Sequence, residues 1–218
     1  MDNFKAIAAR EALAFIDDNM VIGVGTGSTV NYFIDELAKI RHRIDACVAS
    51  SNATEARLRA AGIPVIELNV ADVLPIYIDG ADEVNARHEL IKGGGGALTR
   101  EKIIASVATQ FICIVDGTKF VHRLGAFPVA IEVIPMARSY VARELVKLGG
   151  DPVYRDGFIT DNGNIILDVY NMPLGCLPKT LEDTINTIPG VVENGIFGSR
   201  LADKIIVAGK NGVKIYGV

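Results

Sequence analysis

Short aliphatic runs alternate with helical periods through the first half of the chain, and this rhythm constrains the fold more than any other feature. Residues 20–24, 44–49 and 111–115 are almost continuously apolar, which is typical of strands that are buried on both faces. Residues 30–37 instead carry apolar side chains at helical spacing. Strands of this kind, joined through helices, form a mostly parallel sheet that helices cover on both sides. The sequence therefore predicts an α/β fold with a Rossmann-like sheet domain.

Further elements of this first domain follow from the same patterns. We expect helices at residues 5–16, 54–61 and 99–108, and strands at residues 64–68 and 74–78. A hairpin formed by residues 204–208 and 213–216 is expected to return to the same sheet. We therefore assign residues 1–127 together with 204–218 to an α/β catalytic domain.

The rhythm changes after about residue 127. The expected elements are a strand at 129–133, a helix at 137–148, a hairpin at 157–170 that turns at DNGN, a helix at 180–188 and a strand at 191–197. The resulting order βαββαβ is that of a ferredoxin-like fold. Residues 128–203 are thus predicted to form a smaller α+β domain.

Composition and charge exclude several classes of protein. Half of the 218 residues are hydrophobic, yet no apolar run reaches the length of a membrane span, which is roughly 18 residues. The beginning of the chain lacks the apolar stretch of a signal peptide. The 22 basic and 26 acidic side chains give a net charge of -4, and Trp is absent. We therefore expect a cytoplasmic protein with no nucleic-acid or membrane partner.

Cysteine and histidine spacing gives no sign of a metal site. The three cysteines, Cys47, Cys113 and Cys176, are far apart among apolar neighbours, as is typical of buried thiols in a reducing compartment. The three histidines share no ligand spacing with one another or with the cysteines. We expect no zinc site.

The glycine turn GVGTGST, residues 23–29, joins the first strand to the next helix. Free N–H groups and the helix dipole attract anions at such a junction. A dinucleotide fingerprint would have a third glycine where Ser28 stands, and the hydroxyls of Thr26, Ser28 and Thr29 suit a sugar phosphate better. The alternative is a tight turn with a Ser/Thr helix cap. A second hydroxyl cluster, SSNAT at 50–54, either lines the same crevice or caps the next helix.

The acidic turn DGADE, residues 79–83, follows a predicted strand. Asp79 and Asp82 should therefore lie at the carboxyl edge of the sheet, where open α/β folds bind ligands. Three carboxylates in five residues resemble a Mg²⁺ site, although Lys92 would compete with the cation. Alternatively, the two aspartates accept hydrogen bonds from amides of the turn.

The tract KGGGG, residues 92–96, has a high cost in conformational entropy on folding. Such a cost suggests that the backbone must approach a ligand closely. Each ordered glycine costs about 0.5–1 kcal/mol relative to alanine. Thr99 is expected to cap the following helix and to place Glu101 in its first turn, where the dipole favours an ionised base. Glu101 can also be an ordinary first-turn residue. Lys119, after another strand, either reaches the same edge as a second cation or lies on the surface.

These groups match the needs of an aldose to ketose isomerisation. A base must move a proton between adjacent carbons, an electrophile must stabilise the oxyanion, and protons must move between oxygens. Glu101 and Lys92 suit the first two roles, and the aspartates Asp79 and Asp82 suit the third.

Several motifs, in this order and spacing, resemble the A type of ribose-5-phosphate isomerase. They are GVGTGST, SSNAT, DGADEVN, IKGGGGALTREKI and VDGTKF, followed by AIEVIPMAR, LVKLGG, TDNGNIILDV and IPGVVENGIF. The resemblance covers nearly the whole chain. It implies a homodimeric enzyme that interconverts ribose 5-phosphate and ribulose 5-phosphate in the non-oxidative pentose phosphate pathway, with neither a metal nor an organic cofactor.

The resemblance also implies roles for single residues. Glu101 would be the base that shuttles the proton between C1 and C2 through an enediolate, and Lys92 would stabilise the oxyanion. Asp79 and Asp82 would hold the sugar hydroxyls and assist proton movement. The implied substrate site comprises Thr26, Gly27, Ser28, Thr29, Asp79, Gly80, Ala81, Asp82, Lys92, Gly93, Gly94, Gly95 and Lys119.

Two other functions remain as alternatives. One is a sugar-phosphate sensing module that binds without turnover, which would need an attached DNA-binding segment that we do not expect here. The other is a different sugar-phosphate or acyl-CoA enzyme, because a fold does not determine its chemistry.

Overall fold

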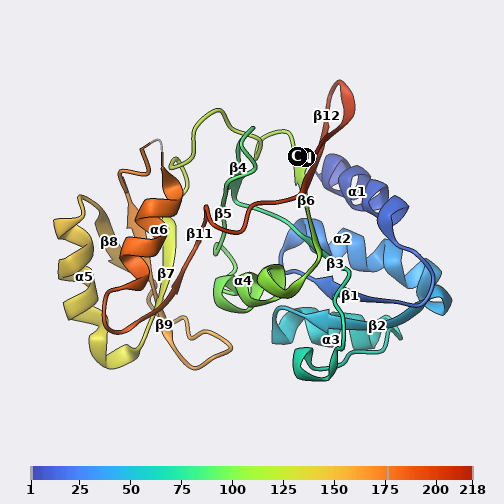
Figure 1. Ribbon diagram of the computed structural model, residues 1–218, viewed down its shortest axis with the longest axis horizontal. Coiled ribbons are helices and arrows are strands. Elements are labelled where there is room, and N and C mark those ends of the chain that lie inside the picture. The colour runs from blue at the N-terminus through green and yellow to red at the C-terminus, as the bar shows by residue number, and fades with distance from the viewer. Residues whose placement is uncertain (1, 176, 218) are drawn as a thin grey trace. The chain divides into compact units, whose positions relative to one another are not determined.

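The computed structural model describes residues 2–175 and 177–217, which form two compact units (Figure 1). Unit 1 contains the residues up to Ala81, Arg100–Phe120 and the residues from Ala202 onward, and unit 2 contains Asp82–Thr99 and Val121–Leu201. Cys176, which was predicted to be buried, lies outside the described residues. None of the described helices is long and apolar enough to cross a membrane.

The predicted domains, 1–127 with 204–218 and 128–203, differ from these units at three segments, of which the shortest, residues 202–203, belongs to unit 1. Residues 82–99 and 121–127 belong to unit 2. The first segment supplies two strands of a small sheet in unit 2. The second is held to that sheet by the Val121 N–H, which donates to Val84 O.

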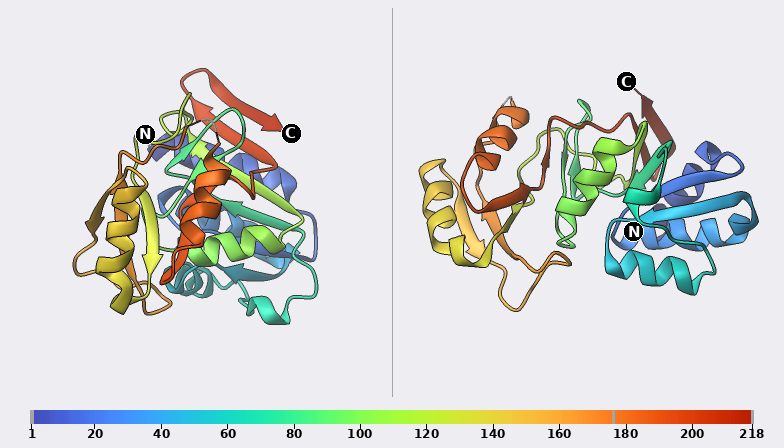
Figure 2. Two further views of the ribbon diagram at one scale, coloured as in Figure 1. Left: turned by 60° about the vertical axis from the view of Figure 1, so that its left-hand side comes forward. Right: turned by 60° about the horizontal axis from the view of Figure 1, so that its bottom comes forward.

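Unit 1 is built on a mostly parallel sheet, as predicted. Its six strands lie in the order β13-β12-β6-β3-β1-β2. Their bounds are Met20–Val24 (β1), Ile44–Ala49 (β2), Ile76–Asp79 (β3), Gln110–Asp116 (β6), Lys204–Gly209 (β12) and Gly212–Gly217 (β13). Strands β1, β2, β3, β6 and β12 pair in parallel, and β13 runs antiparallel to β12. The predicted return of the last hairpin to this sheet is confirmed, and Figure 2 shows that hairpin in red.

Helices cover both faces of this sheet because successive strand side chains point to opposite sides. The helices are Asp2–Glu11 (α1), Ser28–Leu37 (α2), Asn52–Ala60 (α3) and Leu98–Val107 (α4). Ile22 and Val24 of β1 belong to a buried cluster with residues of α1 and α2. The intervening Gly23 faces Ile104 of α4.

Two predictions in unit 1 are wrong. Residues 64–68 form no regular strand: Val65 makes an isolated bridge with Cys47, and the 3-10 turn Leu68–Val70 then bends the chain away from β2. The first helix was predicted as one element at residues 5–16. The α-helix α1 instead ends at Glu11, and a separate 3-10 turn, Ala12–Phe15, follows it.

Unit 2 contains the predicted ferredoxin-like arrangement. The strands and helices are Val129–Val133 (β7), Arg138–Lys147 (α5), Asp151–Tyr154 (β8), Ile165–Tyr170 (β9), Pro178–Asn186 (α6) and Val191–Asn194 (β10). Their sheet has the order β10-β7-β9-β8, and every pair is antiparallel. The predicted hairpin at 157–170 is wrong in its first arm. That arm is β8, and residues 155–164 lead through a turn closed by Thr160 N–H and Asn164 O.

A second, smaller sheet in unit 2 escaped prediction. It has the order β11-β5-β4, with bounds Glu83–Val84 (β4), Leu90–Ile91 (β5) and Ile196–Phe197 (β11). The predicted strand at 191–197 is therefore split between two sheets. Two-residue strands are too short to show the alternation on which strand prediction depends.

The two faces of the four-stranded sheet serve different purposes. Ile131, Leu167 and other residues of one face pack with Val141 of α5 and Ile185 of α6 in a large apolar cluster. On β7 and β9 the alternate residues Ala130 and Ile166 instead pack with Leu98, the first residue of α4. This face therefore supports the segment that leads from the glycine tract into α4.

Gly195 joins the two sheets of unit 2 at a point of very close approach. Its N–H donates to Ala130 O at 2.7 Å, and its carbonyl accepts from Lys92 N–H at 2.9 Å. A Cβ at this position would lie 2.1 Å from Lys92 O. A side chain here would therefore push apart the strands that hold Lys92.

We expect Gly195→Ala to lower the free energy of unfolding by about 2 kcal/mol or more, because the backbone must shift to relieve the overlap. Gly209→Ala is the matched control, since a Cβ at Gly209 meets none of the described atoms within 4 Å. Urea denaturation of both variants checks this. Equal stability of the two variants would contradict the close approach.

Cys47 lies in the middle of β2 and is fully buried. Burial raises the pKa of its thiol to about 12. The reactive species of a cysteine is the thiolate, so this side chain should be inert in the folded protein. Cys113 of β6 is also buried.

Iodoacetamide at pH 8 should therefore leave Cys47 unmodified in the native protein and should modify it after unfolding in guanidinium chloride, as peptide mass spectrometry can determine. The raised pKa also has a consequence for stability. An unfolded thiol titrates near about 8.5, so the stabilisation from the neutral thiol is complete below that pH and is lost as the pH rises toward about 12. Alkylation of Cys47 at the same rate in both states would refute this assignment.

Candidate active site

In unit 1 the two hydroxyl clusters meet at the carboxyl edge of the sheet. Thr26 Oγ1, after β1, lies 2.7 Å from Ser50 Oγ and 2.8 Å from Ser51 Oγ, after β2. The Thr54 hydroxyl donates to Gly25 O at 2.7 Å. Ser51 also caps α3, because its Oγ accepts from Thr54 N–H at 3.0 Å. The SSNAT segment thus both caps a helix and supports the glycine turn.

Asp79, the last residue of β3, holds that turn in place. The carboxylate is fully buried, and its Oδ1 accepts from Gly80 N–H at 2.7 Å and from Thr26 N–H at 3.1 Å. The Tyr77 hydroxyl donates to the other oxygen, Oδ2. A Cβ at Gly25 would lie 1.9 Å from this carboxylate, so only glycine can occupy position 25.

Sequence reasoning missed Tyr77 and the steric need for Gly25. The available signal for Tyr77 was a hydroxyl inside an apolar strand, two residues before Asp79 and so on the same face. The predicted turn, in which Asp79 accepts from local amides, is present at Gly80. It coexists with the contact to Thr26, which comes from a different strand end.

Glu101 lies in the first turn of α4 and is only 4% exposed. Burial raises the pKa of the Tyr77 hydroxyl well above its ordinary value, and the negative charges of Asp79 and Glu101 raise it further, whereas a hydrogen bond with Ser50 lowers it. Tyr77 therefore stays protonated as a hydrogen-bond donor. Asp79 accepts the Tyr77 hydrogen bond, and Glu101 is near enough for its charge to raise the pKa of that hydroxyl.

The expected cap of α4 is wrong. The helix begins at Leu98, so Thr99 lies inside the first turn, and its hydroxyl donates to Glu132 of β7. Glu132 is fully buried and also accepts from Thr160 Oγ1 at 2.8 Å and Asn164 Nδ2 at 2.8 Å. The TDNGN turn thus helps to hold the beginning of α4.

The remaining predicted residues of unit 1 lie around the same edge. Gly27, at a φ of 125°, is the N-cap of α2, so the predicted Ser/Thr cap is not formed. Ser28 is exposed, and its hydroxyl accepts from Lys5 Nζ at 3.0 Å. Thr29, Gly80, Ala81 and Lys119 are half-buried. Lys119 follows the carboxyl end of β6, where its N–H donates to Asp116 O.

In unit 2, Asp82 binds the backbone of the glycine tract. Its Oδ2 accepts from Gly94 N–H at 2.8 Å. Much of the need for glycine here comes from packing. A Cβ at Gly93 would lie 2.6 Å from the Ala130 Cβ, and one at Gly96 would lie 2.2 Å from Phe158. Gly94 and Gly95 are exposed, and there the predicted approach of a ligand stays a prediction.

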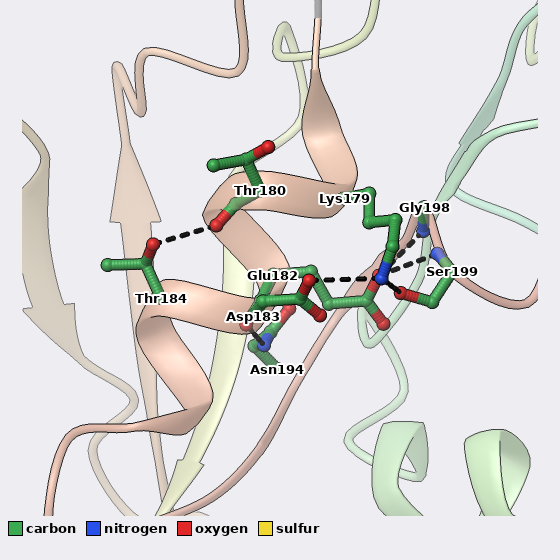
Figure 3. A network of polar contacts seen from close by, with 8 residues as sticks. All are labelled: Lys179, Thr180, Glu182, Asp183, Thr184, Asn194, Gly198 and Ser199. Atoms are coloured by element: carbon green, nitrogen blue, oxygen red, sulfur yellow. Dashed lines mark hydrogen bonds and ion pairs between the residues drawn. The ribbon is translucent and has the colours of Figure 1, made fainter.

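Lys92 directly follows β5, and its side chain is buried against β11. It is 3% exposed, and its Nζ lies 5.7 Å from the centroid of the Phe197 ring. The segment after Phe197 is anchored to α6 (Figure 3): Glu182 accepts from the N–H groups of Gly198 at 2.9 Å and Ser199 at 2.8 Å. This anchor fixes the strand that carries the ring facing Lys92.

Each unit thus contributes a distinct chemical capacity. Unit 1 provides the buried carboxylates of Asp79 and Glu101 beside a group of hydroxyls, which suits proton transfer. Unit 2 provides a buried ammonium group and exposed glycine amides, which suit a developing negative charge. Among the residues that the structure describes, no group of three or more His, Cys, Asp or Glu side chains is placed to hold a metal ion.

The chain is similar to known proteins over nearly its full length. A family model described as ribose 5-phosphate isomerase A (phosphoriboisomerase A) matches residues 46–212. A ribose-5-phosphate isomerase A from Legionella pneumophila (strain Lens) is 71% identical over 98% of this chain and 98% of its own length.

Solved structures agree with the sequence comparison. A ribose 5 phosphate isomerase A from Neisseria gonorrhoeae is 46% identical, with a TM-score of 0.97 over 99% of this chain and 96% of its own. A D-ribose-5-phosphate isomerase in complex with phospho-erythronic acid is 44% identical, with a TM-score of 0.95 over 99% of this chain and 98% of its own. This protein therefore belongs to the ribose 5-phosphate isomerase A family.

Proposed function

We propose that this protein interconverts D-ribose 5-phosphate and D-ribulose 5-phosphate in the non-oxidative pentose phosphate pathway. The observation that carries the proposal is the 71% identity, over 98% of both chains, with a ribose-5-phosphate isomerase A. The reaction moves a proton from C2 to C1 and a hydroxyl proton from O2 to O1 through an enediolate. The aldose and the ketose are isomers, so no atom or electron is gained or lost and no redox cofactor is required.

Glu101 is the proposed base for the carbon proton. Its position in the first turn of α4 places the carboxylate near the positive end of the helix dipole, which favours the ionised form that accepts a proton. Burial removes competing water and strengthens the electrostatic interactions of the carboxylate. The same group returns the proton to the neighbouring carbon.

Lys92 and the glycine amides are proposed to stabilise the negative oxygen of the enediolate. A buried ammonium stabilises an oxyanion more strongly than a solvated one does. Of the predicted amides of Gly93, Gly94 and Gly95, that of Gly94 donates to Asp82, and those of Gly93 and Gly95 are proposed to add donors that need no side-chain movement. Asp79 and Asp82 are proposed to hold the sugar hydroxyls and to assist proton transfer between O1 and O2.

The other predicted residues are proposed to bind the substrate. Thr26, Gly27, Ser28 and Thr29 lie at the N-terminal end of α2, a favourable place for an anion. Gly80, Ala81 and Lys119 complete the proposed set. Phospho-erythronic acid, the ligand of a 44% identical structure, combines a phosphate with a planar carboxylate that resembles an enediolate in charge and shape, which supports the proposal.

The proposal extends to the state of the enzyme. We propose a cytoplasmic homodimer that uses neither a metal nor an organic cofactor. The support is the resemblance to the family, and the reaction itself can be completed by the acid, base and cationic groups named above.

The purified protein should convert ribose 5-phosphate to ribulose 5-phosphate at an undiminished rate in excess EDTA, because the proposed acid and base groups are side chains. The ketose product can be followed by its absorbance or by NMR. Arabinose 5-phosphate and glucose 6-phosphate, assayed beside it, should react much more slowly. Activity lost to EDTA would contradict the metal-free mechanism, and a preference for the hexose phosphate would contradict the substrate.

Glu101→Gln should reduce kcat by at least roughly 10²-fold with a small change in KM, because a general base acts on the transition state and contributes about that factor. Glu55→Gln is the matched control, since Glu55 also lies in the first turn of a helix, α3, but its side chain is 44% exposed. Steady-state kinetics of both variants decide. Near-normal turnover by Glu101→Gln would remove this residue from the role of base.

A further inference from the structure

Arg155, just after β8 in unit 2, contacts the glycine tract from its carbonyl side. Its Nη2 donates to Gly93 O at 3.1 Å, and its Nη1 donates to Gly94 O at 3.3 Å. These are two consecutive carbonyl groups of the tract. One guanidinium therefore binds two adjacent peptide groups in a segment that has no side chains of its own to hold it.

The rest of the guanidinium is held firmly. Arg155 Nε and Nη2 donate to the two carboxylate oxygens of Asp168 in β9, at 2.8 Å and 2.5 Å. The guanidinium carbon, Cζ, also lies 5.3 Å from the centroid of the Phe158 ring. The side chains of this ion pair are 18% and 17% exposed. A paired, stacked and mostly buried guanidinium has little freedom to move away from the tract.

Because peptide units are planar, the hydrogen bonds to the carbonyl groups also restrict the N–H groups of the tract. Each peptide unit is planar and trans, so a fixed carbonyl fixes the direction of the next residue's N–H, which points the opposite way. Gly93 O and Gly94 O belong to the peptides that carry the N–H groups of Gly94 and Gly95. Hydrogen bonds to the carbonyls also polarise those peptides and strengthen the N–H groups as donors.

We propose that Arg155 is a positioning residue that fixes and polarises the glycine tract so that the amide of Gly95 can bind the negative oxygen of the substrate, while the Gly94 N–H stays bound to Asp82. The proposal rests on the proposed function for the meaning of the amides, but the positioning itself rests on contacts within unit 2. Glycine is the most flexible residue, and the tract is otherwise held by the hydrogen bond from Gly94 N–H to Asp82 and by the turn from Gly96 N–H to Gly93 O, so a contact to its carbonyls adds a further constraint. Arg155 supplies this constraint, and Asp168 fixes the guanidinium to the four-stranded sheet.

Arg155→Lys keeps the positive charge but removes the fork that reaches two carbonyls. We expect kcat for ribose 5-phosphate to fall about 10- to 100-fold with a smaller change in KM, since a small misplacement of binding groups costs up to about that factor. The amide resonances of Gly94 and Gly95 in a ¹⁵N-labelled sample should shift. Asp168→Asn should cause a smaller change of the same kind.

Arg138→Lys is the matched control. Arg138 also lies in unit 2 with its guanidinium over an aromatic ring, at 4.7 Å from the centroid of Tyr154. It should leave kcat within about twofold and the two amide resonances unmoved. An Arg155→Lys variant with unmoved Gly94 and Gly95 resonances, or with no greater loss of kcat than the control, overturns the proposal. If the wild-type protein fails to isomerise ribose 5-phosphate, the proposed function falls, and the amide resonances still decide whether Arg155 positions the tract.

Discussion

The buried carboxylate of Asp79 is the contact on which the organisation of unit 1 depends. It binds the ends of two neighbouring strands together by accepting N–H groups from Thr26 and Gly80. Gly25 must lack a side chain to admit it, and the Tyr77 hydroxyl must stay protonated to satisfy it. Once Thr26 is fixed in this way, its hydroxyl can meet those of the next strand end. The Asp79 carboxylate thus fixes the backbone at Thr26 and Gly80, requires glycine at position 25 and keeps the Tyr77 hydroxyl protonated.

Buried carboxylates repeat this arrangement in unit 2. Glu83 accepts the N–H groups of Gly125 at 2.6 Å and Phe127 at 2.7 Å, and Glu182 accepts those of Gly198 and Ser199. Glu132 instead accepts from the side chains of Thr160 and Asn164. Burying a carboxylate is costly, but two or more hydrogen bonds to its ionised form offset much of that cost. Glu83 and Glu182 hold loops in this way, because a backbone N–H in a loop has no strand partner and needs another acceptor.

The sequence predicted those features that depend on local pattern. The apolar strands β1, β2 and β7 and the βαββαβ order were recognisable because their periodicity spans several residues. The meeting of the two hydroxyl clusters followed from a general rule, that parallel strands end at one edge. The positions of Arg155, Glu132 and Gly195 were not predictable, because their importance lies in contacts with distant residues. The glycine tract was predictable only in part. The entropic cost of its glycines indicated that the backbone approaches another group closely, but only the structure identifies Ala130 and Phe158 as the neighbours.

The division of the chain between the units has a consequence for synthesis on the ribosome. The chain passes from one unit to the other four times, at residues 81/82, 99/100, 120/121 and 201/202. Strand β12 pairs with β6, and β13 with β12, so unit 1 cannot complete its sheet until residues 204–217 have been translated. Until then β6 is an open edge, the kind of surface that recruits strands from other chains. A nascent chain of this protein thus carries an open strand edge from the synthesis of β6, Gln110–Asp116, until β12, Lys204–Gly209, has been made.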